Sequence, residues 1–139
     1  MIQNDKNERL LVFLLRLGAI LTGSAFFTIF LPETTMASVH ESLGLGAFPA
    51  SPLTNYLTRS LSVMYAFHGG LLFVLSTNVR RFKPVVLFVG WATAVLGVTL
   101  LVIDLRAPMP GWWVFAEGPW VFAIGLVIAW LSRRIEPSP

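Results

Sequence analysis

Four ionisable side chains near the ends of long apolar runs are the strongest candidates for chemistry in this sequence. Arg59, Asp104 and Glu117 lie a few residues inside such runs, and Arg106 follows two residues after Asp104. A charge inside a membrane-spanning helix costs about 2.5–3.5 kcal/mol on insertion scales, so charges at one depth are expected to pair or to be hydrated. We therefore predict a cluster in which Arg59 meets Asp104 and Glu117, joined by Arg106.

The residue types leave three interpretations of this cluster open. It is a structural ion network that fixes the register of the helices, a water-filled cavity that binds a small ligand, lipid head group or ion, or a contact to a partner protein. In an enzyme, Asp104 or Glu117 would exchange protons and Arg59 would hold an anionic group. No motif in the sequence names a reaction.

The other polar residues predict neither a metal site nor a cofactor site. His68 lies about 180° around its helix from Arg59, so it faces away from the predicted cluster. His40 and Glu41 are adjacent and lack the i, i+3 or i, i+4 spacing that aims two ligands at one metal. The chain has no cysteine, which excludes disulfides, cysteine-ligated zinc and thiol catalysis.

The composition indicates a membrane protein. Of the 139 residues, 55% are hydrophobic and 12% are charged, whereas soluble domains carry about 25% charged residues. Disorder requires low hydrophobicity, so lipid must cover the apolar surface. The net charge is +3. Because the basic residues lie at the ends of apolar runs and do not form a patch with interleaved aromatics, we expect no nucleic-acid partner.

Four apolar runs are each long enough to cross a bilayer, which takes roughly 20 residues of helix. Backbone groups inside lipid must be satisfied within the chain, so these runs are expected to be helices. We predict an all-α fold, a single membrane domain over residues 1–139 and a bundle of four transmembrane helices. The predicted helices cover residues 10–31, 53–77, 84–105 and 112–131.

A short helix is predicted between the first two spans, over about residues 34–44. Met36, Val39 and Leu43 share one apolar helical face there, and Gly44 can end the helix. This pattern favours a helix that lies on the outer membrane surface. It would cover the end of the bundle or act as a mobile gate, and both readings stay open.

Pro119 interrupts the last apolar run. If the helix began at this proline, only about 20 Å of helix would remain, which is short for a span. We therefore expect a helix that starts near Trp112 and kinks before Pro119.

The positions of lysine and arginine predict the orientation in the membrane. With the N-terminus in the cytoplasm, only Arg59 and Arg106 of the ten basic residues lie on the outer side. We therefore place both termini in the cytoplasm. The basic residues on that side are Lys6, Arg9, Arg16, Arg80, Arg81, Lys83, Arg133 and Arg134.

Small residues predict which helix faces pack, because they let backbones approach closely. The third helix has the clearest stripe of small residues, and Asp104 ends it. The four predicted faces, in chain order, are Gly18, Thr22 and Ala25; Arg59, Ser62, Ala66, Gly69, Phe73 and Ser76; Gly90, Ala94, Gly97, Leu101 and Asp104; and Glu117, Val121, Ile124 and Ile128.

Several short motifs carry a resemblance that covers most of the chain. They are HESLGLG at 40–46, YLTRS at 56–60, VRRFKP at 79–84, IDL at 103–105, MPGWW at 109–113 and EGP at 117–119. On these motifs the chain resembles a family of small bacterial four-helix integral membrane proteins with no assigned activity. More loosely, its helix count and size are similar to DoxX-like membrane proteins, some of which are associated with quinone or thiosulfate oxidation modules. The resemblance implies a bacterial inner membrane and transfers no site residues.

We expect a non-enzymatic protein that binds a small ligand or serves as an accessory subunit of a membrane assembly. The alternative is a membrane enzyme or redox partner that acts on a lipid-soluble substrate such as a quinone. A pore built by oligomerisation is disfavoured, because the polar residues are confined to one leaflet. The lipid bilayer is the expected partner, and a membrane-protein partner or a second copy of the chain stays open.

Overall fold

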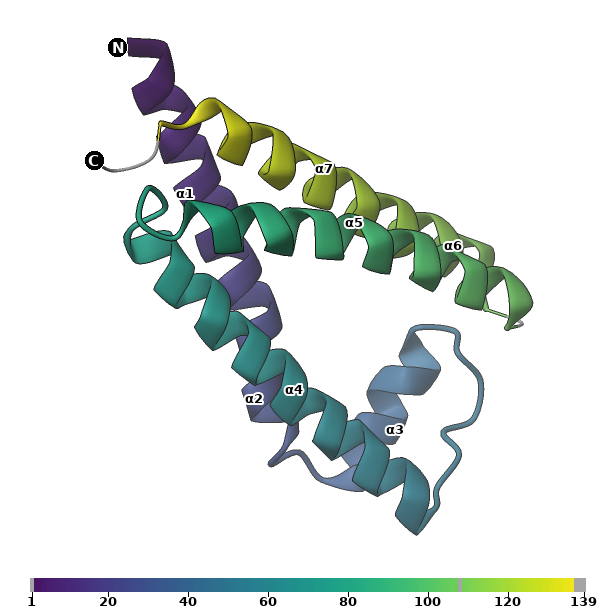
Figure 1. Cartoon of the computed structure of the whole chain (residues 1–139). Coiled ribbons are helices and arrows are strands. Elements are labelled where there is room, and N and C mark those ends of the chain that lie inside the picture. The colour runs from purple at the N-terminus through teal and green to yellow at the C-terminus, as the bar shows by residue number, and fades with distance from the viewer. Residues whose placement is uncertain (1, 108, 137–139) are drawn as a thin grey trace. The chain divides into compact units, whose positions relative to one another are not determined.

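Four long apolar helices dominate the chain, as the sequence predicts (Figure 1). The computed structural model describes residues 2–107 and 109–136, with side chains from Asp5 onward, and these residues form helices without strands. Each long helix is apolar enough and, at about 1.5 Å per residue, long enough to cross a membrane. The candidate spans are Asp5–Thr28, Pro52–Thr77, Lys83–Arg106 and Gly111–Arg134.

Seven helices within the described ranges build these spans and their connections. The first span contains α1 and α2, and the fourth contains α6 and α7. The helices are α1 (Ile2–Gly23), α2 (Ala25–Thr28), α3 (Glu33–Ser42), α4 (Pro52–Thr77), α5 (Lys83–Arg106), α6 (Gly111–Ala116) and α7 (Gly118–Arg134).

Contacts divide the chain into two compact units. Unit 1 comprises Met1–Leu15 and Val74–Pro139, and unit 2 comprises Arg16–Phe73. Unit 1 thus holds the first part of α1 with α5, α6 and α7, and unit 2 holds the rest of α1 with α2, α3 and most of α4. The single membrane domain and the joining of all four spans into one bundle stay predictions.

In unit 1, α5 and α7 lie side by side and antiparallel (Figure 1). Their backbones touch, because a Cβ atom added to Gly97 would lie 2.3 Å from the backbone nitrogen of Phe122. The predicted packing face of α5 is therefore confirmed. The contacting pairs are Gly90 with Ala129, Ala94 with Gly125, Gly97 with Phe122 and Leu101 with Gly118.

The packing face of α7 differs from the predicted one. Of the predicted residues, Ile128 is buried but Ile124 is 42% exposed. The residues that meet α5 include Gly118, Gly125 and Ala129, which follow i, i+7 and i+11, the same spacing as in the α5 stripe. The prediction followed branched residues, whereas close helix contact depends on the smallest ones.

Unit 2 has a similar contact between α1 and α4. A Cβ atom added to Gly69 would lie 2.6 Å from the backbone nitrogen of Gly23 and 2.8 Å from the carbonyl oxygen of Ala19. Gly18 faces the side chain of Leu72 in the same pair of helices. Gly18 and Gly69 thus pack as their predicted faces require.

Both ends of the first helix differ from the predicted bounds of residues 10–31. α1 begins at Ile2, about two turns earlier, because polar residues extend the helix beyond the apolar run. After α2 the chain tightens into i→i−3 bonds, in which the N–H of Ile29 donates to Phe26 and that of Leu31 donates to Thr28. Pro32 then stops the helix, since it has no N–H to donate.

The short helix predicted near residues 34–44 is present as α3. It ends in a Schellman motif: the N–H of Gly44 donates to the carbonyl of Glu41 at 2.9 Å, and that of Leu45 to His40 at 3.3 Å. Gly44 adopts φ +74°, a left-handed conformation that glycine accepts readily. Its predicted role as the stop residue is confirmed, whereas the interfacial position of α3 stays a prediction.

The predicted kink before Pro119 is confirmed. Glu117 separates α6 from α7, with φ −97° and ψ −78°. The helical hydrogen bonds continue on both sides, from the N–H of Glu117 to Trp113 at 2.9 Å and from Val121 to Glu117 at 3.1 Å. The fourth span is therefore one interrupted helix that starts at Gly111.

The α5–α7 contact predicts the effect of adding a single methyl group. Gly97→Ala places that methyl against the backbone of Phe122, so we expect the free energy of unfolding to fall by about 1–3 kcal/mol. The matched control is Gly70→Ala in α4, where an added Cβ meets nothing within 4 Å. Titration with sodium dodecyl sulfate in mild detergent measures the free energy of unfolding of both variants. Equal stability of the two would contradict this contact.

Candidate functional site

Arg59 of α4 hydrogen-bonds the end of the first span. Its Nε donates to Oδ1 of Asn55 at 2.6 Å, one turn away on the same helix. Its Nη1 donates to the carbonyl oxygen of Ile29, and its Nη2 to that of Leu31 at 3.1 Å. All three acceptors are neutral, and the side chain is partly buried.

The position of Arg59 follows from Pro32. A helix leaves its last carbonyl groups without partners, and a proline just beyond it removes a donor. Inside a membrane such carbonyls cost several kcal/mol each, because no water replaces the lost N–H. The rigid fork of a guanidinium supplies several donors at once, so Arg59 satisfies Ile29 and Leu31 together.

Asp104 is the buried carboxylate of the candidate site. The residue is 5% exposed, and its Oδ2 has no hydrogen-bond partner in the part of the chain that the structure describes. It lies one turn beyond Leu101, which contacts Gly118 at the start of α7. A buried polar atom without a partner costs about 1–3 kcal/mol, and more when it is charged, so this oxygen demands a donor.

Glu117 and Arg106 lie near the same end of the α5–α7 pair. Oε2 of Glu117 accepts a hydrogen bond from Nε1 of Trp113 at 2.6 Å, across one turn of the interrupted span. Arg106 occupies the last turn of α5 and is exposed. A cation at that position is favoured by the partial negative charge of the helix C-terminus.

Asp104 and Glu117 both lie near one contact of the α5–α7 pair, and their predicted pairing in a cluster stays a prediction. Glu117 precedes Gly118, which touches Leu101, and Asp104 is three residues after Leu101. The two carboxylates therefore lie within about one helical turn of the same contact. Arg59 belongs to unit 2, so its pairing with these carboxylates stays a prediction.

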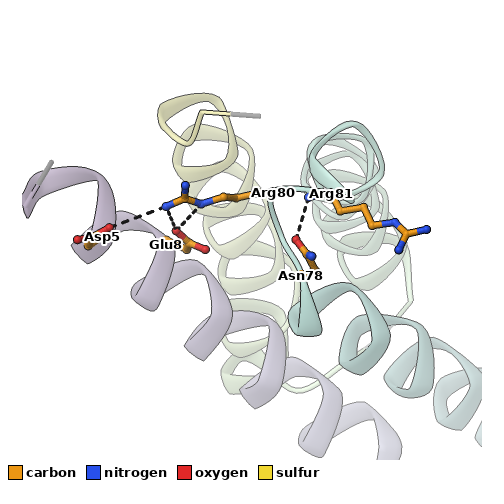
Figure 2. Close-up of polar contacts among 5 residues, drawn as sticks. All are labelled: Asp5, Glu8, Asn78, Arg80 and Arg81. Atoms are coloured by element: carbon orange, nitrogen blue, oxygen red, sulfur yellow. Dashed lines mark hydrogen bonds and ion pairs between the residues drawn. The ribbon is translucent and has the colours of Figure 1, made fainter. Parts of the chain in front are cut away.

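Sequence reasoning missed an ion pair at the other end of unit 1 (Figure 2). Arg80, in the turn between α4 and α5, donates from Nε and Nη2 to Oε2 of Glu8 at 2.9 and 2.7 Å. Asp5 lies 3.9 Å from the same guanidinium, and Figure 2 shows Arg81 pointing away from it. The hydrogen bonds that Arg80 donates to Glu8 raise the pKa of Arg80, and the negative charge of Glu8 raises it further.

The geometry defines what this site can do chemically. Three nitrogens of Arg59 already donate to backbone and amide oxygens, so its role in the structure is to hold the end of the first span against α4. Asp104 offers an unused acceptor, and Glu117 offers a carboxylate held by an indole. In the described ranges, no group of three His, Asp or Glu is placed to hold a metal ion.

Comparisons with known proteins add no relatives to this picture. No family model matches the sequence, and neither a curated protein nor a solved structure is significantly similar to the chain.

The hydrogen bonds of Arg59 predict a cost when its donors are removed. Arg59→Leu leaves the carbonyls of Ile29 and Leu31 without partners, so we expect the free energy of unfolding in mild detergent to fall by about 2 kcal/mol or more. Arg106→Gln removes an exposed arginine and should change it by less than about 0.5 kcal/mol. If Arg59→Leu is as stable as the parent chain, the guanidinium is not needed at the end of the first span.

Proposed function

We propose that this chain is a multi-pass protein of the bacterial inner membrane that acts without catalysis, as a binder of a small ligand or as an accessory subunit. Its site is the outer-leaflet pair Asp104 and Glu117 at the end of α5 and the break before α7. The observation that carries the proposal is the buried Oδ2 of Asp104, which has no partner among the described residues.

A purely structural role explains Asp104 poorly. The α5–α7 contact is made by glycine, alanine and leucine, which need no carboxylate at the end of their stripe. In a structural ion network, the buried oxygen would receive a donor from a neighbouring helix, and it receives none in the described chain. Because this buried oxygen of Asp104 has no donor among the described residues, we infer that its hydrogen-bond donor belongs to another molecule.

The environment of Asp104 narrows the class of molecule that would bind. Ile103 and Leu105 on either side of it are 52% and 69% exposed, so the approach is apolar. The bound group would combine a hydrogen-bond donor, such as an amine, amide or hydroxyl, with an apolar body. A transmembrane helix of a partner that carries such a donor meets the same requirement.

The short helix α3 belongs to the same proposal. Met36 is buried, while Val39 and Leu43 are 50% and 39% exposed. An apolar exposed face on a short helix after the first span suits a position on the outer membrane surface. There α3 would cover the outer end of the helices.

A second function shares the same site. The hydroxyl of a reduced quinone is a donor on an apolar ring, which fits the unused oxygen of Asp104. A redox partner or enzyme acting on such a lipid-soluble substrate would use Asp104 or Glu117 to exchange protons. We rank this function second because no other group in the described chain points to a reaction.

Purification in a gentle detergent from the native host tests the proposal. We expect the parent chain to carry a specific partner protein, lipid or small molecule, and Asp104→Ala to lose it while remaining folded. Because the substitution removes a buried oxygen without a partner, its free energy of unfolding should stay equal or rise by about 1 kcal/mol. Mass spectrometry identifies the associated species.

The matched control is Thr99→Ala, which changes an exposed polar residue of α5. It should retain whatever the parent chain carries. A quinone lost specifically from Asp104→Ala would favour the second function. If both variants carry the same species as the parent, Asp104 does not bind it, and the proposed function is wrong.

The cysteine-free sequence makes the proposed orientation easy to measure. Ala47→Cys lies in the exposed segment after α3, and Glu136→Cys in the exposed segment after α7. With both termini in the cytoplasm, a membrane-impermeant maleimide should label Ala47→Cys in cells whose outer membrane is permeabilised. It should label Glu136→Cys only after the inner membrane is opened. The reverse pattern would overturn the assigned orientation.

A further inference from the structure

At the end of unit 1 where α5 begins and α7 ends, the arginines have two kinds of partner. Arg80 is paired with the carboxylates of Glu8 and Asp5. Arg133 and Arg134 instead lie over aromatic rings, with guanidinium carbons 5.3 Å from the ring centre of Trp91 and 5.0 Å from that of Trp130.

Hydrogen bonds join the start of α5 to the end of α7 at this end of unit 1. Nζ of Lys83, at the start of α5, donates to the carbonyl of Ile135, just after α7. The hydroxyl of Ser132 donates to the carbonyl of Lys83 at 3.4 Å. The last turn of α7, with Arg133 and Arg134, therefore lies beside the first turn of α5.

Aromatic faces orient a guanidinium without neutralising it. Contact with a ring attracts the cation by about 0.5–1 kcal/mol at exposed sites and leaves its N–H donors free. In the described part of the chain, ion pairs involve only Arg80, so no carboxylate there is paired with Arg133 or Arg134. The carboxylate that follows them in the sequence, Glu136, is next to Ile135 and exposed. Arg133 and Arg134 are exposed, so their planar N–H groups can donate hydrogen bonds to two oxygens of a phosphate.

The surface beside these arginines is apolar. Trp91, Trp130 and Phe88 are 43%, 52% and 70% exposed on the spans that carry the arginines or lie next to them. Tryptophan rings settle at the boundary between head groups and acyl chains. A ligand that matches this surface has a phosphate for the guanidinium groups and a hydrocarbon chain for the rings.

We propose that Arg133 and Arg134, oriented by Trp91 and Trp130, form a binding site for the phosphate of an anionic phospholipid. The acyl chains lie along the exposed aromatic side of α5 and α7. The site is at the opposite end of α5 from Asp104, and it is independent of the ligand or partner proposed there.

Spin-labelled lipids test the site on the full chain reconstituted in vesicles. Electron paramagnetic resonance gives the affinity for phosphatidylglycerol relative to phosphatidylcholine. Each cation near a membrane surface contributes about 1 kcal/mol, or roughly fivefold in affinity. We therefore expect Arg133→Gln with Arg134→Gln to abolish most of the preference for phosphatidylglycerol. Trp91→Leu with Trp130→Leu should keep both charges and lower the preference about twofold to fivefold.

The matched control is Arg9→Gln, which removes one exposed charge from the same end without touching a stacked arginine. It should leave most of the preference intact. If Arg9→Gln lowers the preference as much as Arg133→Gln alone, the attraction is diffuse and the proposed site is wrong. Displacement of the labelled lipid by excess glycerol phosphate would show that the site takes a free phosphate, which also overturns the lipid proposal.

Discussion

Hydrogen bonding of the backbone without help from water is the constraint on which this structure depends. A helix that crosses lipid satisfies itself along its length, but its interruptions do not. At the end of the first span, Arg59 supplies the donors that Pro32 cannot. At the break in the fourth span, the bonds on either side of Glu117 resume almost at once. A charged residue and a near-continuous helix are thus two solutions to one problem.

Close approach of glycine to the backbone of a neighbouring helix is the second constraint, because apolar side chains gain little free energy on moving from lipid to protein. The antiparallel α5–α7 pair has four such contacts in regular order along its length. This order leaves Asp104 at one end of the pair and the stacked arginines at the other. The polar groups of unit 1 therefore lie where the close packing stops. One proposed binding site lies at each of these two ends.

The sequence predicted the features that depend on one segment at a time. The four apolar spans, the stripe from Gly90 to Asp104, the stop at Gly44 and the kink before Pro119 all follow from local periodicity or from a single special residue. The early start of α1 could not be predicted from hydropathy, because the residues that extend the helix are polar. The contact face of α7 and the pairing of Arg80 with Glu8 could not be predicted from one segment either. They depend on which segments meet, and hydropathy carries no information about that. For the candidate site, the sequence marked Asp104 and Glu117, but the neutral partners of Arg59 emerge only in three dimensions.

The hydrogen bonds of Arg59 have a consequence for biosynthesis. The carbonyls of Ile29 and Leu31 are made first, yet their donors are synthesised about thirty residues later, as part of the next span. During translation the first span is therefore incomplete when it leaves the ribosome, and its trailing end gains its partners only when α4 follows. Insertion as a helical hairpin, with the two spans entering the bilayer together, avoids exposing that end to lipid alone.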